Sequence, residues 1–304
     1  MNINSIIDEL SLRIDKNRMI PDAQMREYTS FKTGGTAALL AEPGNVDELS
    51  HALKVLNKRG IEHMVIGNGS NLLVKDSGYN GVILRIGKPF QEIDITGERM
   101  EAGAGALLSE AASKAGNASL TGFEFASGIP GTIGGAVFMN AGAYDGEISQ
   151  IIESAEILSA DGLRTFTMSK DELELSYRHS ILQITGDILL KAVLRLTKGD
   201  NEKITARMNE LTARRNEKQP LNYPSAGSFF KRPHNNFAGK LIQEAGLRGL
   251  TLGGAQVSSL HSGFIINTGE ATASDIINLM EIVRSTVYEK SGVLLEPEVR
   301  IIGD

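Results

Sequence analysis

The sequence predicts an α+β fold built from two domains. The chain has 304 residues, which is enough for two domains of ordinary size and for a core that needs no cross-links. Strand-like and helix-like segments mix without a regular strand–helix–strand order, which argues against a doubly wound parallel sheet. The pattern of apolar and charged residues changes near residue 200, where KGDNEK ends a strand pattern and a charged helical pattern follows. We therefore divide the chain into residues 1–200, split again near residue 80, and residues 201–304.

The composition excludes several classes of protein. There is no cysteine, so a disulfide framework, a thiolate metal site and a cysteine nucleophile are excluded. The formal charge of −6 argues against a nucleic-acid partner. No apolar run approaches the roughly 20 residues of a membrane helix. The N-terminus reads as an amphipathic helix rather than a signal peptide, and a cytoplasmic protein is expected.

Periodicity predicts most of the secondary structure. Helices are expected over residues 1–16, 46–59, 107–115, 202–218, 237–245 and 272–290. Strands are expected over 63–67, 71–75, 81–86, 91–102, 151–168, 187–197, 255–267 and 294–303, and residues 22–31 read as extended. The 151–168 pair turns at Asp161-Gly162, a good hairpin signal. Residues 122–143 contain six glycines and read as neither an amphipathic helix nor a regular strand.

A first glycine motif, IGNGSNLLV at 66–74, directly follows a predicted strand. Such a turn can cradle a phosphate with its backbone N–H groups. It is not a dinucleotide fingerprint, because Leu72 stands where a third glycine is needed. A tight turn rich in Gly and Asn explains this segment equally well when it is taken alone.

A second motif, GIPGTIGGAVFMNAGAY at 128–144, is glycine-rich and otherwise apolar. A backbone of this kind can lie flat against a large ligand and offer bare N–H groups to phosphate. The alternative is a buried, closely packed turn, but structural loops seldom combine so many glycines with so few polar residues. Two such segments suit a long ligand with a central pyrophosphate, and flavin adenine dinucleotide (FAD) is one.

Two groups in the second half carry candidate chemistry. The charged helix ends with the basic residues Arg214, Arg215 and Lys218. Ser228 follows a glycine and precedes two phenylalanines and the basic pair 231–232. A hydroxyl beside apolar rings and cations suits a pocket for an anion, although a solvated basic face and a structural serine are the default readings.

Acidic residues and histidines complete the survey. Glu296 and Glu298 lie two apart on the last predicted strand, where solvated acids at a sheet edge are the plain alternative. The five histidines show no metal-ligand spacing, and no metal site is expected.

These segments together resemble the UDP-N-acetylenolpyruvoylglucosamine reductase family. The resemblance runs from about residue 28 to residue 303 and consists of five motifs in one order: IGNGSNLLV, GIPGTIGGAVFMNAGAY, SYR at 176–178, GSFFKRP at 227–233 and LEPEVRIIG at 295–303. Any one of them would be weak, whereas five at compatible spacing are highly specific.

The resemblance implies a fold and a cofactor. Residues 1–200 would form the two-part FAD-binding unit of the vanillyl-alcohol-oxidase (PCMH) type, and residues 201–304 a smaller α+β substrate-binding domain whose strand 293–303 returns toward the flavin. FAD would bind non-covalently. The implied cofactor-binding residues are Gly67, Asn68, Gly69, Ser70, Asn71, Leu72, Gly128, Ile129, Pro130, Gly131, Gly134, Gly135, Ala136, Asn140, Ala141 and Gly142.

The resemblance also implies a reaction. NADPH would reduce the flavin, and the reduced flavin would pass hydride to the vinyl carbon of a UDP-linked N-acetylglucosamine enolpyruvate, giving UDP-N-acetylmuramate. Arg178 matches the arginine that stabilises the enolate charge. Glu298 matches the acid that shares this role, protonated or hydrogen-bonded, because a bare carboxylate would repel an enolate. Ser228 matches the proton donor, since a carbanion-like enolate is a strong base.

Further residues follow from the same resemblance. Arg214, Lys218, Tyr177 and Lys240 match substrate-binding positions, and Arg300 is a loose candidate for a flavin contact. A larger subtype carries a closing tyrosine on an inserted loop. Residues 179–213 contain no tyrosine, so the chain resembles the compact subtype, and Tyr223 or Phe264 are guesses for the closing side chain.

The resemblance implies a cytoplasmic monomer in peptidoglycan synthesis, and thereby in cell-wall biogenesis, cell shape, the cell cycle and division. Its expected partners are NADPH and the enolpyruvyl sugar nucleotide, with no nucleic acid and no membrane. Two other functions stay open. A related flavin oxidase would often bind flavin covalently through His or Cys, yet neither glycine segment contains either residue. A non-catalytic nucleotide-binding protein would be expected to lack part of the catalytic set.

Overall fold

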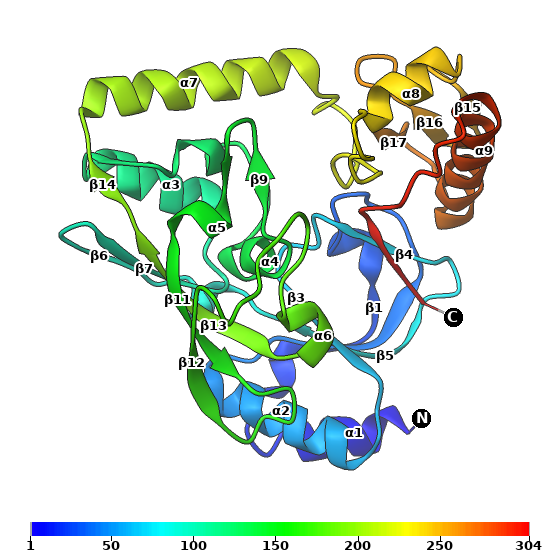
Figure 1. Ribbon diagram of the computed structural model, residues 1–304. Helices are drawn as coiled ribbons and strands as arrows, with labels where there is room; N and C mark the ends of the chain where they lie inside the picture. The colour runs from blue at the N-terminus through cyan, green and yellow to red at the C-terminus, as the bar shows by residue number, and fades with distance from the viewer. Residues whose placement is uncertain (1, 304) are drawn as a thin grey trace. The chain divides into compact units, whose positions relative to one another are not determined.

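The structure is a computed structural model that describes residues 2–303 (Figure 1). Its α-helices are α1 (Ile3–Leu10), α2 (Val46–Lys58), α3 (Leu108–Asn117), α4 (Ile133–Phe138), α5 (Ile148–Ile151), α6 (Leu182–Thr185), α7 (Asn201–Lys218), α8 (Ala238–Glu244) and α9 (Ala273–Ser291). Short 3-10 helices are η1 (Lys16–Arg18), η2 (Met25–Glu27), η3 (Lys88–Phe90) and η4 (Glu124–Ala126).

The strands fall into small sheets. They are β1 (Met19–Gln24), β2 (Thr36–Ala41), β3 (His63–Ile66), β4 (Leu72–Val74), β5 (Tyr79–Arg85), β6 (Ile93–Thr96), β7 (Arg99–Gly103), β8 (Leu120–Thr121), β9 (Gly142–Ala143), β10 (Gly146–Glu147), β11 (Ile152–Leu158), β12 (Thr165–Ser169), β13 (Ile188–Arg195), β14 (Thr197–Lys198), β15 (Thr251–Leu252), β16 (Ala255–Val257), β17 (Ile265–Asn267) and β18 (Arg300–Ile302).

The chain forms two compact units that do not follow a single cut in the sequence. The first unit contains Met1–Pro21, Leu39–Asn68 and Gly81–Arg214, and the second contains Asp22–Ala38, Gly69–Asn80 and Arg215–Asp304. The chain passes between the units inside β1, β2, β5 and α7. This division differs from the expected boundary near residue 200, because two early segments join the C-terminal unit and α7 is shared.

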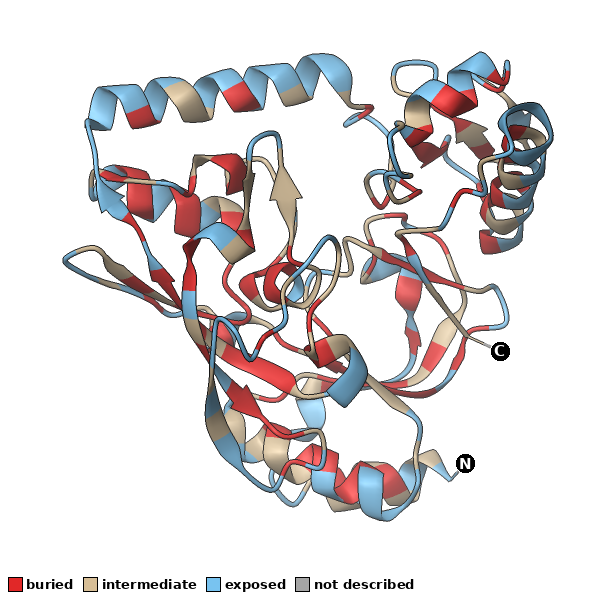
Figure 2. Ribbon diagram, in the orientation of Figure 1, coloured by how far each residue is buried: buried red, intermediate tan, exposed pale blue. Residues whose placement is uncertain are grey.

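The first unit is built around a five-stranded antiparallel sheet with the order β12-β11-β13-β7-β6. Strand β13 is apolar and buried along most of its length, so both of its faces are covered. Edge strand β12 alternates between exposed and partly buried residues, as a strand with one wet face does. One core lies under the apolar faces of α1 to α4 and of strands β3, β5, β7, β11 and β13 (Figure 2). A further sheet has the order β1-β2-β5-β3.

The second unit packs the antiparallel sheet β15-β16-β17 with α8 and α9 around a separate core. Helix α9 begins with a capping box between Thr272 and Asp275 and ends at Gly292, whose φ is +70°. The Asp76 carboxylate also accepts the backbone N–H groups of Ala273 and Ser274, at 2.8 and 2.7 Å. Strand β18 pairs in parallel with β4. These contacts place the segment around β4 with the C-terminal third of the chain.

Most predicted helices and strands are confirmed, and four segments differ. The helix expected over residues 1–16 ends at Leu10. Residues 22–31 are extended only as far as Gln24, where η2 begins. The 122–143 stretch contains the helix α4 despite its glycines, because the Thr132 hydroxyl caps it and its apolar residues are buried. Of the final predicted strand, only Arg300–Ile302 forms a regular strand. Within residues 2–303, no helix combines the length and apolarity needed to span a bilayer.

Candidate active site

The two glycine motifs meet in the first unit. Gly67 and Asn68, which follow β3, lie against the loop before α4: Asn68 Nδ2 donates a hydrogen bond to the Pro130 carbonyl at 3.0 Å. A β-carbon on Gly67 would lie 2.3 Å from Thr132 Oγ1, so no larger residue fits there without a shift. The expectation that both motifs serve one ligand is therefore sterically consistent within this unit.

Most of the expected cofactor residues leave backbone within reach of a ligand. Asn68, Pro130 and Gly135 are exposed, and a β-carbon on Gly135 would meet nothing closer than 3.7 Å. The remaining partly exposed positions are Gly67, Gly69, Ser70, Asn71, Gly128, Ile129, Gly131, Gly134, Ala141 and Gly142. An accessible glycine-rich backbone of this kind fits the phosphates of a dinucleotide.

Three of the expected cofactor residues are buried. Leu72, Ala136 and Asn140 are 5%, 2% and 0% exposed. The Asn140 carboxamide is used within the protein, since Nδ2 donates to the Ser176 carbonyl at 3.0 Å and Oδ1 accepts the Ser149 N–H at 2.9 Å. The assignment of these three residues to the cofactor stays a prediction.

Two buried hydroxyls flank the glycine motifs without a hydrogen-bond partner in the described part of the chain. Ser127 Oγ comes directly before Gly128, and Thr29 Oγ1 belongs to a segment that adjoins Gly69. Buried polar atoms are nearly always paired in proteins, so unpaired ones at this place are consistent with a missing polar group. The sequence carried no signal for either residue.

The expected catalytic arginine lies on a tight turn in the first unit. Ser176 and His179 exchange backbone hydrogen bonds at 3.1 and 3.2 Å, and Arg178 between them has a left-handed φ of +54°. Its guanidinium lies 5.1 Å from the centre of the Tyr177 ring and donates a long hydrogen bond of 3.4 Å to the Gly142 carbonyl. A non-glycine residue in this conformation is uncommon and is typical of functional positions.

The expected serine and acid lie close together in the second unit. The backbone N–H of Glu298 donates to the carbonyl of Phe229, the residue after Ser228, at 2.8 Å. Two positions on, the Lys231 N–H donates to the Glu296 carbonyl at 2.8 Å. Ser228 is exposed, whereas the Phe229 ring is fully buried and fixes the segment in the core. Of the two acids, Glu296 is 71% exposed and pairs with Lys231 on the surface.

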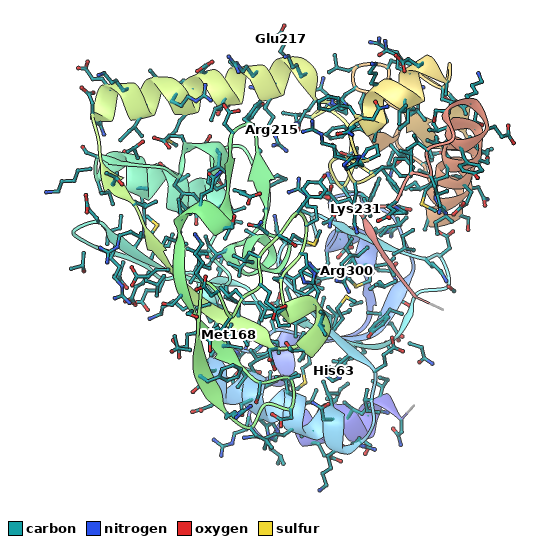
Figure 3. The ribbon with its side chains drawn as sticks, in the orientation of Figure 1. His63, Met168, Arg215, Glu217, Lys231 and Arg300 are labelled. Atoms are coloured by element: carbon teal, nitrogen blue, oxygen red, sulfur yellow. The ribbon has the colours of Figure 1, made fainter. Side chains whose placement is uncertain are left out.

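The first glycine motif reaches the same place in the second unit. Asn71 Nδ2 donates to the Glu298 carbonyl at 3.1 Å, and the Arg300 N–H donates to the Asn71 carbonyl at 3.1 Å. Ser30 Oγ bonds the carbonyls of Ser70 and Ser225. Lys231 and Arg300, labelled in Figure 3, both belong to this unit. An expected flavin-binding segment is thus joined to the segment of Glu298 by both the side chain and the backbone of Asn71.

His261 supports the serine segment. Its Nδ1 accepts the Gly263 N–H at 3.1 Å, and the Gly263 carbonyl accepts the Phe229 N–H at 2.8 Å. Burial lowers the pKa of His261 below its ordinary value of 6.5, which favours the neutral ring that this acceptor role needs.

The expected substrate residues lie on several different elements, in both units. Arg214 belongs to the first unit and pairs with Glu210 at 2.6 Å, while Lys218, at the end of α7, belongs to the second. Lys240 lies on α8, 3.7 Å from Glu244. Tyr177 and Tyr223 are 50% and 47% exposed.

Phe264 is 3% exposed and packs edge-on against His261, so the guess that it closes the site is wrong.

Each unit therefore assembles part of the expected site. The first holds Arg178, Tyr177 and the second glycine motif, and the second holds Ser228, Glu298 and residues 69–72. Within residues 2–303, no cluster of three His, Asp or Glu side chains is arranged to hold a metal ion, and the chain has no cysteine.

Comparison with known proteins decides the family. Residues 37–167 match the FAD binding domain family, and residues 219–302 match the family described as UDP-N-acetylenolpyruvoylglucosamine reductase, C-terminal domain. The chain is 50% identical to the UDP-N-acetylenolpyruvoylglucosamine reductase of Clostridium botulinum (strain Alaska E43 / Type E3), over 100% of both chains. The chain belongs to this reductase family.

Solved structures agree with this family membership. The UDP-N-acetylenolpyruvylglucosamine reductase of Thermus caldophilus superimposes with a TM-score of 0.80 at 35% identity, over 94% of this chain and 98% of that one. Wild-type Phl p 4.0202, a glucose dehydrogenase, gives a TM-score of 0.53 at 13% identity over 65% of this chain and 44% of its own, a likeness of fold alone. The expected family, fold class and flavin cofactor are confirmed.

Proposed function

We propose that this chain uses NADPH and bound FAD to reduce UDP-N-acetylglucosamine enolpyruvate to UDP-N-acetylmuramate. The observation that carries the proposal is full-length identity of 50% to a reductase of this name, together with an intact set of Arg178, Ser228 and Glu298. A non-catalytic relative would be expected to have lost part of that set. When bound, the flavin would carry hydride from NADPH to the sugar nucleotide.

The accessible glycine backbone of the first unit is proposed to bind most of the cofactor. Gly67, Asn68, Gly128 and Gly131 would face it with their backbone N–H groups. The Ile129 and Gly134 N–H groups already bond the Ala126 and Ala104 carbonyls, and these residues would face it with the rest of their backbone. Ser127 Oγ, buried and unpaired, would gain a partner there.

Arg178 is proposed to stabilise the negative charge that develops on the substrate's enolate. A guanidinium is always charged, and its stacking on Tyr177 leaves the planar N–H groups aimed by a rigid turn. Fixed charge of this kind favours the transition state over the ground state. Glu298 would share this role, protonated or hydrogen-bonded.

Ser228 is proposed to donate the proton that completes the reduction. Its backbone is fixed on both sides by the hydrogen bonds of Phe229 to Gly263 and Glu298. The exposed hydroxyl would therefore be presented by a rigid segment. A carbanion-like enolate is basic enough to take a proton from a hydroxyl.

The remaining assignments are proposals of the same kind. The C-terminal unit would bind the sugar nucleotide, with Lys218, Lys240, Tyr177 and Arg214 as candidate contacts. We further propose a cytoplasmic monomer acting in peptidoglycan precursor synthesis, with the associated roles in cell-wall biogenesis, shape and division.

The experiment compares the two half-reactions in Ser228→Ala by anaerobic stopped-flow absorbance. Flavin reduction by NADPH should keep its wild-type rate, whereas reoxidation by the enolpyruvyl sugar nucleotide should fall at least about 100-fold, as loss of a general acid predicts. Equal loss in both half-reactions would remove the proton-donor role. Formation of UDP-N-acetylmuramate by the wild type, identified by mass spectrometry, tests the overall reaction.

A further inference from the structure

The backbone of Arg178 needs support from its surroundings. Its φ of +54° is disfavoured for a residue with a side chain, even at the third position of the tight turn from Ser176 to His179, where positive values occur. Residues persist in such conformations when neighbouring structure determines them. The contacts of this turn therefore show what aims the guanidinium.

Those contacts converge on the end of α4 and the residues after it. Asn140 Nδ2 bonds the Ser176 carbonyl, and the fully buried Ser180 donates its hydroxyl to the Phe138 carbonyl at 2.8 Å. Gln183 Nε2 donates to the same Phe138 carbonyl at 2.7 Å. Phe138 is the last residue of α4, a position whose carbonyl lies beyond the regular hydrogen bonds of the helix and accepts these two donors.

Gln183 alone among these side chains also bonds Arg178 itself. The same Nε2 donates to the Arg178 carbonyl at 3.1 Å. An amide nitrogen has two protons, so these two hydrogen bonds use its full donor capacity. Rotation of the peptide after Arg178 would move this carbonyl and break the bond. The hydrogen bond therefore stabilises the left-handed backbone directly.

We propose that Gln183 is a positioning residue for Arg178. It clamps the arginine backbone to the glycine motif through Phe138, and it acts through Arg178 without touching substrate. The inference rests on the proposed charge-stabilising role of Arg178. It extends the site to a glutamine on α6 that none of the five motifs includes.

The test is Gln183→Met in the flavin-loaded enzyme, which keeps the length of the side chain and removes both hydrogen bonds. Reoxidation of reduced flavin by the enolpyruvyl sugar nucleotide should slow roughly 10- to 100-fold, the scale of a small misplacement of a catalytic group. Flavin reduction by NADPH should stay within about 2-fold of wild type, because Arg178 has no proposed part in it. The proposal would be overturned if neither rate changed or if both rates fell equally.

Gln256→Met is the matched control, because it also removes a glutamine hydrogen bond, from Gln256 Nε2 to Thr251 Oγ1 at 2.9 Å in the second unit. Both half-reactions should keep wild-type rates in this control. If Gln183→Met does not fold, Gln183→Glu serves instead, because the carboxylate has the same shape and no N–H donor. The same selective loss is expected from it.

A double-mutant cycle with Arg178→Ala separates positioning from a general structural effect. Once the guanidinium is absent, adding Gln183→Met should slow reoxidation no further, since the two changes remove one function. A full additional loss in the Arg178→Ala background would overturn the inference. If Arg178→Ala itself reoxidised at the wild-type rate, the proposed role of Arg178 would fail instead.

An NMR measurement tests the position of the Arg178 side chain without any turnover. In ¹⁵N-arginine-labelled protein without flavin, the Arg178 Nε resonance, assigned with Arg178→Lys, should shift or broaden in Gln183→Met while the other arginine resonances stay in place. An unchanged Arg178 resonance would contradict the proposal.

Discussion

Replacing Asn140 by Ala should destabilise the protein more than replacing an exposed asparagine does. The side chain is completely buried and bonds the Ser176 carbonyl and the Ser149 N–H. Its removal leaves the Ser149 N–H unpaired, at about 1–3 kcal/mol, whereas the Ser176 carbonyl keeps the hydrogen bond from the His179 N–H. We expect a decrease of about 1–3 kcal/mol in the free energy of unfolding.

Asn235→Ala is the control for backbone strain. Asn140 and Asn235 have φ values of +42° and +54°, and Asn235 is exposed. Alanine is disfavoured in this conformation at both positions, so the difference between the variants isolates the buried hydrogen bonds. Urea denaturation with linear extrapolation measures it, and the slope should not change. A difference below about 1 kcal/mol would refute the assignment of Asn140 as the tie between the glycine motif and the arginine turn.

Three further predictions concern other contacts. Gly67→Ala should weaken FAD binding about 10-fold in a fluorescence titration, because the added carbon would lie 2.3 Å from Thr132 Oγ1, and wild-type affinity would contradict this packing. Burial raises the pKa of Asp76, but hydrogen bonds from Ser274 and the backbone outweigh it and hold that pKa below 3.8. Asp76→Ala should therefore cost about 1 kcal/mol at neutral pH, and thermal melts should show the difference vanishing as pH falls below 3.8; a difference that persists in acid would count against the cap. Because the pKa of His261 is lowered in the folded state, its contribution to the free energy of unfolding is fully present above pH 6.5. Below pH 6.5 the unfolded state takes up the proton and the free energy of unfolding falls. His261→Asn should lose less stability over that acid range, and an identical pH profile would exclude His261 as its source.

Local patterns account for most of the fold. Apolar periodicity and turn residues predicted the β11–β12 hairpin, the buried strand β13 and the long helices α7 and α9, because each of these elements has its pattern in one continuous stretch of sequence. Helix α4 was missed, since glycines at 134 and 135 lower helix propensity and only burial and the Thr132 cap compensate. The joining of residues 69–80 to the C-terminal unit depends on β4 pairing with β18, which no local pattern encodes.

The candidate site divides in the same way. Glycine motifs, the arginine and the serine could be recognised because their chemistry depends on residue type at fixed spacing. Gln183, Asn140 and His261 act through backbone carbonyls and N–H groups. Nothing in the sequence around Gln183 and His261 distinguishes them from ordinary polar residues. The motif that contains Asn140 predicted a cofactor contact and not its hydrogen bond to the arginine turn, which only the folded chain identifies.

The most direct test of the proposed reaction is an anaerobic absorbance experiment on the purified protein. The oxidised flavin bands should bleach when NADPH is added and return when the UDP-linked enolpyruvyl sugar follows, with no oxygen present. Bands that return only on exposure to oxygen would contradict the reductase and indicate an oxidase. A colourless protein that takes up no added FAD would contradict the flavin site itself.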